Sequence, residues 1–178
     1  MRQGTSIATT AAAAVLGLAV PRPGQAGELE GSRERAWARH IRAVDEALAR
    51  RDVSAAEGAW HDAYVSALGS WQWEGLLEVG HASLRIGQLS GLRQVAAAKA
   101  RNLYLAALFR ARQHRSVEGF LRAAEAFAGL GDREVAEQCL RIARALAREA
   151  RDPEASARVA AVAARIGNRS VTASEPGR

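Results

Sequence analysis

The sequence is poor in the residues that define several classes of protein. Among 178 residues it has one cysteine, Cys139, four prolines and only 5% aromatic residues. A single cysteine excludes a disulfide framework, and the low proline content excludes a collagen-like chain. Charges of both signs alternate with alanine, leucine and valine, which is not the pattern of a disordered charged tail. A chain of this length buries enough surface to form one core without a metal.

Catalytic and metal-binding motifs are also missing. The sequence contains no nucleophile elbow, no P-loop, no glycine-rich dinucleotide fingerprint and no His-Glu-x-x-His pair. The four histidines, His40, His61, His81 and His114, fall on different predicted helices, so nothing in their spacing predicts a shared metal. We therefore expect a protein that is not an enzyme and that needs no cofactor.

The N-terminal segment has the pattern of a secretory signal peptide. Arg2 precedes an uncharged apolar stretch over residues 5–20, and small residues at Gly24 and Ala26 suit a signal peptidase. Residues 1–26 are therefore predicted to be a signal peptide cut after Ala26, which places the mature protein in the periplasm or outside the cell. The apolar stretch is shorter than the roughly 20 residues of a membrane span. If it is not cleaved, the same segment would anchor the protein to a membrane.

The charge of the mature chain is modest. Removing Arg2 and Arg22 from the 25 basic residues leaves 23, so against 19 acidic residues the charge is +4. The cluster Arg110, Arg112, His114 and Arg115 is interpreted as basic side chains that satisfy carbonyl groups at a helix end. We expect no nucleic acid partner.

Apolar residues recur at intervals of three and four between Ser32 and Gly167, which predicts helices and no strands. Seven helices are predicted, over residues 32–50, 53–68, 71–86, 89–113, 116–129, 132–150 and 152–167. Connections of two or three residues make neighbouring helices antiparallel. Residues 168–178 carry no periodicity and are predicted to form a disordered tail.

One stretch has the spacing of a helical repeat. Aromatic, small and large apolar residues flank a Gly-Asp turn in the series Phe120, Ala123, Ala124, Phe127, Gly131, Asp132, Ala136, Leu140 and Ala143. Arg51-Asp52 is a similar turn followed by Ala56, Trp60 and Ala63 at the same offsets, and Gly87-Gln88 is predicted as a third. This pattern resembles the tetratricopeptide (TPR) repeat, in which small residues let two helices cross closely.

The resemblance implies an all-α fold of stacked antiparallel hairpins over residues 27–167, a right-handed solenoid of about three units plus a C-terminal capping helix. It also implies a scaffold that mediates protein–protein interaction or complex assembly by holding a protein or peptide on its first helices. The inward positions of those helices are Asp45, Glu74, Leu77, His81, Arg85, Glu118, Leu121 and Glu125. This surface is expected to be net acidic and to suit a partner with apolar side chains and a few basic residues.

Trp71 and Trp73 add a second kind of candidate. They lie two apart at a hairpin junction and face different ways, so one of them is a candidate anchor for a partner. The alternative is that both fill the core between the first two units.

An alternative fold and function remain open. A compact helical bundle could serve as an accessory subunit of a periplasmic enzyme or as a ligand or metal carrier, with His40, His61 or His81 inside. Cys139 lies on an apolar stripe and is predicted to be buried, the alternative being an intermolecular disulfide.

Overall fold

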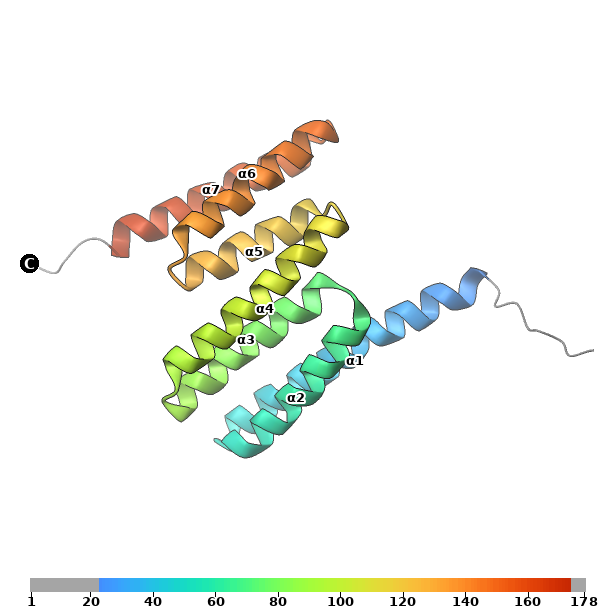
Figure 1. The fold of residues 1–178 in the computed structure, drawn as a ribbon, viewed down its shortest axis with the longest axis vertical. Coiled ribbons are helices and arrows are strands. Elements are labelled where there is room, and N and C mark those ends of the chain that lie inside the picture. Colours follow the sequence, from blue (N-terminus) through green and yellow to red (C-terminus); the bar gives the residue numbers. More distant parts are fainter. Residues whose placement is uncertain (1–22, 174–178) are drawn as a thin grey trace, which may run out of the picture.

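The computed structural model describes the backbone from Pro23 to Ala173 and the side chains from Ala36 to Asn168. This part of the chain forms seven α-helices and no strand, which confirms the predicted all-α class (Figure 1). The helices are α1 (Pro23–Ala49), α2 (Val53–Ser70), α3 (Trp73–Ser90), α4 (Arg93–Gln113), α5 (Val117–Gly129), α6 (Arg133–Glu149) and α7 (Pro153–Ala173).

Consecutive helices pack together in chain order. α1 packs on α2, α3 on α4 and α5 on α6, while α7 contacts α6 and α5. Each odd-numbered helix also contacts the next odd-numbered helix, whereas the backbones of α2, α4 and α6 make no close contact with one another. We call the surface of α1, α3, α5 and α7 the odd-helix face and the surface of α2, α4 and α6 the even-helix face (Figure 1).

The even-numbered helices begin at a regular interval. Their N-cap residues are Asp52, Leu92 and Asp132, and 92 minus 52 and 132 minus 92 are both 40. The residue before each cap has a left-handed backbone, with φ of 59° at Arg51, 79° at Gly91 and 84° at Gly131. This conformation ends the preceding odd-numbered helix. The chain therefore repeats every 40 residues in structure.

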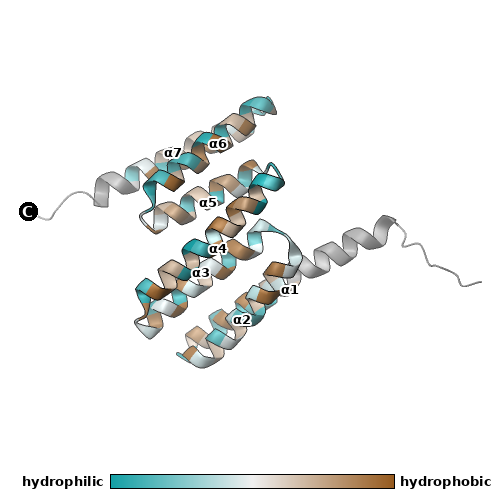
Figure 2. Cartoon of the chain, in the orientation of Figure 1, coloured by the Kyte–Doolittle hydropathy of each residue, from teal (hydrophilic) through white to brown (hydrophobic). Residues whose placement is uncertain are grey.

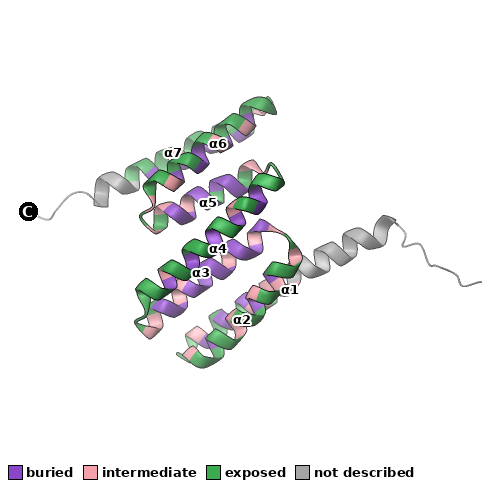
Figure 3. Cartoon of the chain, in the orientation of Figure 1, coloured by how far each residue is buried: buried purple, intermediate pink, exposed green. Residues whose placement is uncertain are grey.

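Small residues recur at the same interval in the core. Ala56, Ala96 and Ala136 are buried at one repeat position, and Ala67, Ala107 and Ala147 at another. A Cβ placed on Gly80 would lie 2.4 Å from a ring carbon of Tyr104, so this helix crossing requires glycine. Figure 3 shows buried residues on α3 and α5, which have neighbours on several sides, and exposed residues along α4 and α6.

Two predicted helix ends are wrong for identifiable reasons. The predicted turn at Gly87 lies inside α3, because Gly87 is a packing position where a Cβ would meet the Ala96 side chain at 2.3 Å. The turn comes at Gly91, and α4 begins at Arg93 and not at residue 89. α7 continues past its predicted end at Gly167 to Ala173, since one glycine costs a helix only about 1 kcal/mol relative to alanine.

The predictions for the two chain ends are only partly covered. α1 begins at Pro23 and not near Ser32, so the predicted cut after Ala26 falls within its first turn. The rest of the predicted signal peptide, residues 1–22, and the last part of the predicted tail, residues 174–178, lie outside the described residues.

Candidate functional site

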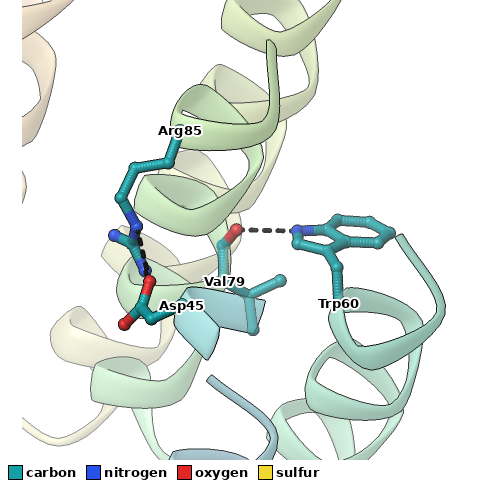
Figure 4. A network of polar contacts seen from close by, with 4 residues as sticks. All are labelled: Asp45, Trp60, Val79 and Arg85. Atoms are coloured by element: carbon teal, nitrogen blue, oxygen red, sulfur yellow. Dashed lines mark hydrogen bonds and ion pairs between the residues drawn. The ribbon is translucent and has the colours of Figure 1, made fainter. Parts of the chain in front are cut away.

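Three ion pairs connect successive helices across the odd-helix face. Asp45 of α1 accepts from Arg85 of α3, with Nη2 and Oδ1 2.9 Å apart, as Figure 4 shows. The second pair joins Glu78 of α3 to Arg122 of α5 at 3.1 Å. The third joins Glu125 of α5 to Arg165 of α7 at 2.6 Å. Each pair is partly exposed and stabilises the fold by about 1 kcal/mol or less, and together they link all four odd-numbered helices.

Two of the three ion pairs follow the 40-residue interval. Asp45, Arg85, Glu125 and Arg165 occupy one repeat position on four successive odd-numbered helices. The sign of the charge alternates along this series, and the two pairs formed within it are Asp45–Arg85 and Glu125–Arg165.

The first cleft of the face lies among α1, α3 and α5. It has a volume of about 300 Å³ and is lined by Trp37, Trp73, Glu74, Leu77, Glu78 and Arg122. Among the described residues, the buried indole nitrogen of Trp37 has no hydrogen-bond partner. This nitrogen lies against Gly75 of α3, where an added Cβ would come within 3.2 Å of it, so it is packed inside the fold. The cleft thus combines an apolar floor with charged sides.

The second cleft lies between α5 and α7. Its volume is about 200 Å³, and it is lined by Glu118, Leu121, Glu125, Arg158, Ala161, Val162 and Arg165. Leu121 and Val162 form the apolar part of this cleft, and both are buried. It has the same composition as the first cleft, with apolar side chains below and charges of both signs around them.

His81 lies on the α3 part of this face, over a buried tyrosine. Its ring meets the ring of Tyr104 edge-on, with centroids 5.3 Å apart. Burial lowers the pKa of His81 below its ordinary value of 6.5, and Glu78 opposes that shift. Arg122 and Arg85 lower the pKa further. The hydroxyl of Tyr104 is buried without a hydrogen-bond partner in the described structure, and burial raises its pKa. His81 is therefore a neutral side chain at neutral pH.

The structure brings most of the predicted site residues together. Six of them line the two clefts: Trp73, Glu74, Leu77, Glu118, Leu121 and Glu125. Asp45 and Arg85 pair with each other on the same face. Trp71 does not join them, because its side chain lies against the Arg110 guanidinium, which reaches from α4.

The expected net acidic character of this face is only weakly present. Three arginines that sequence reasoning missed, Arg122, Arg158 and Arg165, line the clefts beside the acidic residues. They come from the next unit along the chain, so a mapping of each unit by itself does not find them. Aligning the sequence at an interval of 40 would have placed Arg165 beside Glu125.

The other predicted features are distributed as follows. His61 is exposed on α2, while His40 and His81 are half-buried on α1 and α3. No group of three or more metal-ligating side chains occurs in the described structure. Between residues 23 and 173, no helix has the length and apolar character needed to cross a membrane.

Comparisons with protein-family models, curated proteins and solved structures found no match to this chain.

Proposed function

We propose that this protein is a non-catalytic, TPR-like scaffold that holds a segment of another protein on its odd-helix face. The observation that carries this proposal is the order of packing. Odd-numbered helices contact one another while even-numbered helices keep apart, so the odd-numbered helices occupy the inner side of the stack. In helical repeat proteins such a surface binds extended segments of a partner.

The length of the repeat can be compared with the lengths of known helical repeats. An interval of 40 residues is longer than the roughly 34 of TPR repeats and is at the lower limit for HEAT and armadillo repeats, about 40 to 47. Small residues at the helix crossings and left-handed turns between the helices support the TPR-like assignment with lengthened helices.

The clefts indicate the chemistry of the partner. Trp37, Trp73 and Leu77 provide an apolar surface for a side chain of the partner. Glu118 is exposed at the second cleft and suits a basic side chain. A segment with spaced apolar residues and a nearby Arg or Lys would fit both clefts.

Site-specific photo-crosslinking in cells tests this proposal. A photoreactive residue at Glu118 or Glu74 is expected to give a discrete adduct, and one at Arg144, exposed on α6, serves as the matched control. A synthetic peptide from the captured protein should bind the purified chain, and Glu118→Lys should weaken that binding by several-fold. The proposal would be overturned if a photoreactive residue at Arg144 gave as much adduct as one at Glu118 or Glu74. It would also be overturned if Glu118→Lys left the affinity for the peptide unchanged.

The proposed location is tested on the same material. We propose that the protein is exported to the periplasm or secreted, on the basis of residues 1–26. Mass spectrometry of the purified protein should find a mature N-terminus at Gly27. An intact Met1 in membrane fractions would favour the anchored alternative.

A further inference from the structure

Exposed apolar side chains gather on one part of the even-helix face. In the described structure, every exposed large apolar residue lies on α2, on α4, in the turn after α2 or in the turn before α4. These residues are Val65, Leu68, Trp71, Leu92, Val95, Leu105 and Phe109. Trp71 and Phe109 are 68% and 63% exposed. Figure 2 shows hydrophobic patches on α4, and Figure 3 shows that much of this helix is exposed. We call these seven residues the α2–α4 patch.

The repeat itself does not require this patch. Forty residues after Leu105 and Phe109, α6 has Ala145 and Glu149 at the same repeat positions. Leu92 occupies an N-cap position where the other two even-numbered helices have Asp52 and Asp132. A leucine side chain has no oxygen that can accept from the first turn, so the N-terminus of α4 lacks a stabilising cap and carries an exposed apolar side chain instead.

A groove adjoins one end of the patch, where Leu92 and Val95 line it. It has a volume of about 310 Å³ between α2 and α4, with Trp60, Leu92, Val95 and Lys99 in its lining. The Trp60 indole donates to the Val79 carbonyl at 2.9 Å, as Figure 4 shows, and the Lys99 ammonium lies 4.3 Å from the centre of the Trp60 ring. These contacts tie the Trp60 ring to α3 and α4.

The two helices beside the groove carry opposite charges. The charged residues of α2 are Glu57 and Asp62, both acidic and exposed. The charged residues of α4 are all basic. Arg93, Lys99 and Arg112 are exposed on this face, whereas Arg110 is buried and Arg101 pairs with Asp132. The face therefore has an acidic side and a basic side with apolar residues between them.

We propose that this face binds a second copy of the same chain in a two-fold dimer, with α2 of each protomer against α4 of its partner. A two-fold axis makes the interface self-complementary, so the acidic helix meets a basic helix twice. Pairing α4 with α4 of the partner would instead bring like charges together. A standard interface buries roughly 800 Å² per partner, so the contact would include the charged residues beside the patch as well as the patch itself. This proposal does not depend on the odd-helix face.

Light scattering coupled to size exclusion tests the dimer over a range of protein concentrations. The protein as purified is expected to reach twice the molar mass of the single chain. Phe109→Glu, which gives α4 the residue that α6 has at this position, should weaken association at least about tenfold. Ala145→Glu on α6 is the matched control and should associate as the unchanged protein does. A protein that stays monomeric throughout, or a Phe109→Glu variant that still dimerises, overturns the proposal.

A charge-reversal pair tests the arrangement. Glu57→Lys with Asp62→Lys makes α2 basic. Arg93→Glu with Lys99→Glu and Arg112→Glu replaces the three exposed basic residues of α4 that form no ion pair within the described part of the chain, so the charges that α4 presents to a partner become acidic. Each of these two variants alone should be monomeric, because like charges then face each other, while an equal mixture of the two should dimerise. Circular dichroism checks that both variants are folded. Unchanged dimers of either variant alone, or a folded mixture that does not associate, would show that the partner is not a second copy in this arrangement.

Discussion

Arg110 connects α4 to the end of another helix. Its guanidinium donates to the carbonyls of Ala67, Leu68 and Gln72, at 2.9, 3.1 and 3.1 Å. The prediction that the basic residues here satisfy the carbonyls of their own helix end is wrong for Arg110, because two of its acceptors belong to α2 and the third, Gln72, precedes α3. Only a tertiary structure places them together, since the residues are about 40 positions apart.

Replacing this side chain should be costly. Arg110→Ala leaves carbonyls of α2 without a charged donor in a buried place, and should lower the free energy of unfolding by about 2–3 kcal/mol. Urea denaturation measures this change. Arg144→Ala removes an exposed arginine from α6 and should change it by less than about 0.5 kcal/mol. Equal effects of the two substitutions would contradict this role.

His81 should make stability depend on pH. Its pKa is lowered in the folded protein mainly by burial, so the unfolded chain takes up the proton at a higher pH. Since the unfolded state then binds more protons, the free energy of unfolding should fall as the pH drops below 6.5. Urea denaturation on both sides of this pH measures the slope. His81→Gln should flatten it, while His61→Gln, at an exposed site, should leave it unchanged; the reverse order would refute the assignment.

Cys139 is fully buried, as its position on the apolar stripe predicts. Burial raises the pKa of its thiol to about 11, so little reactive thiolate forms at neutral pH. A maleimide should label the native protein slowly and the denatured protein fast. Ala145→Cys, exposed on the same helix, provides a fast-reacting control. Rapid native labelling of Cys139 would instead favour the intermolecular disulfide.

At the scale of elements, the number and type of helices follow from the sequence, whereas the start of α1, the junction between α3 and α4, and the end of α7 do not. Periodic apolar residues identify all seven described helices because each helix buries one stripe. Gly87 and Gly91 look alike in sequence, yet one fits against Ala96 and the other supplies a positive φ. The error at Gly87 also hid the 40-residue interval, because it displaced the second turn.

The cap of α4 offers a gain in stability. Leu92→Asp should stabilise the monomer by about 0.5–2 kcal/mol, as an aspartate there can accept from the first turn in the way that Asp52 accepts from Ala55. Thermal unfolding of dilute protein measures the gain. At higher concentration the same variant should associate less well, since Leu92 belongs to the α2–α4 patch. A loss of monomer stability would contradict the capping argument.

At the scale of the whole molecule, the helices differ in how many neighbours hold them. α3 and α5 each contact four other helices, while α7 contacts only α5 and α6. In a stacked array, such a terminal helix opens most easily. Hydrogen exchange should therefore show slow amides in α3 and α5 and faster ones in α7. Uniform protection along the chain would indicate that the molecule unfolds as one unit.

The candidate site could be predicted in part because one helix fixes the offsets of its own residues. Glu74 and Leu77 lie in one cleft, and Glu118 and Leu121 in the other, since both pairs are spaced by one helical turn. Arg122 and Arg165 were not predicted because their places in the clefts depend on how units stack. The sequence of a single unit does not show how the units stack. Comparing residues 45, 85, 125 and 165 across units does, because their charges alternate in sign.

The alternation at residues 45, 85, 125 and 165 also restricts how such a gene can change by unequal recombination. Loss of one whole unit would set two acidic or two basic side chains beside each other on adjacent helices, whereas loss of two units would keep opposite charges together. Arrays of this design should therefore shrink or grow more easily by even numbers of units. The ion pairs of the odd-helix face would then favour proteins in which the number of units has changed by two and disfavour those in which it has changed by one.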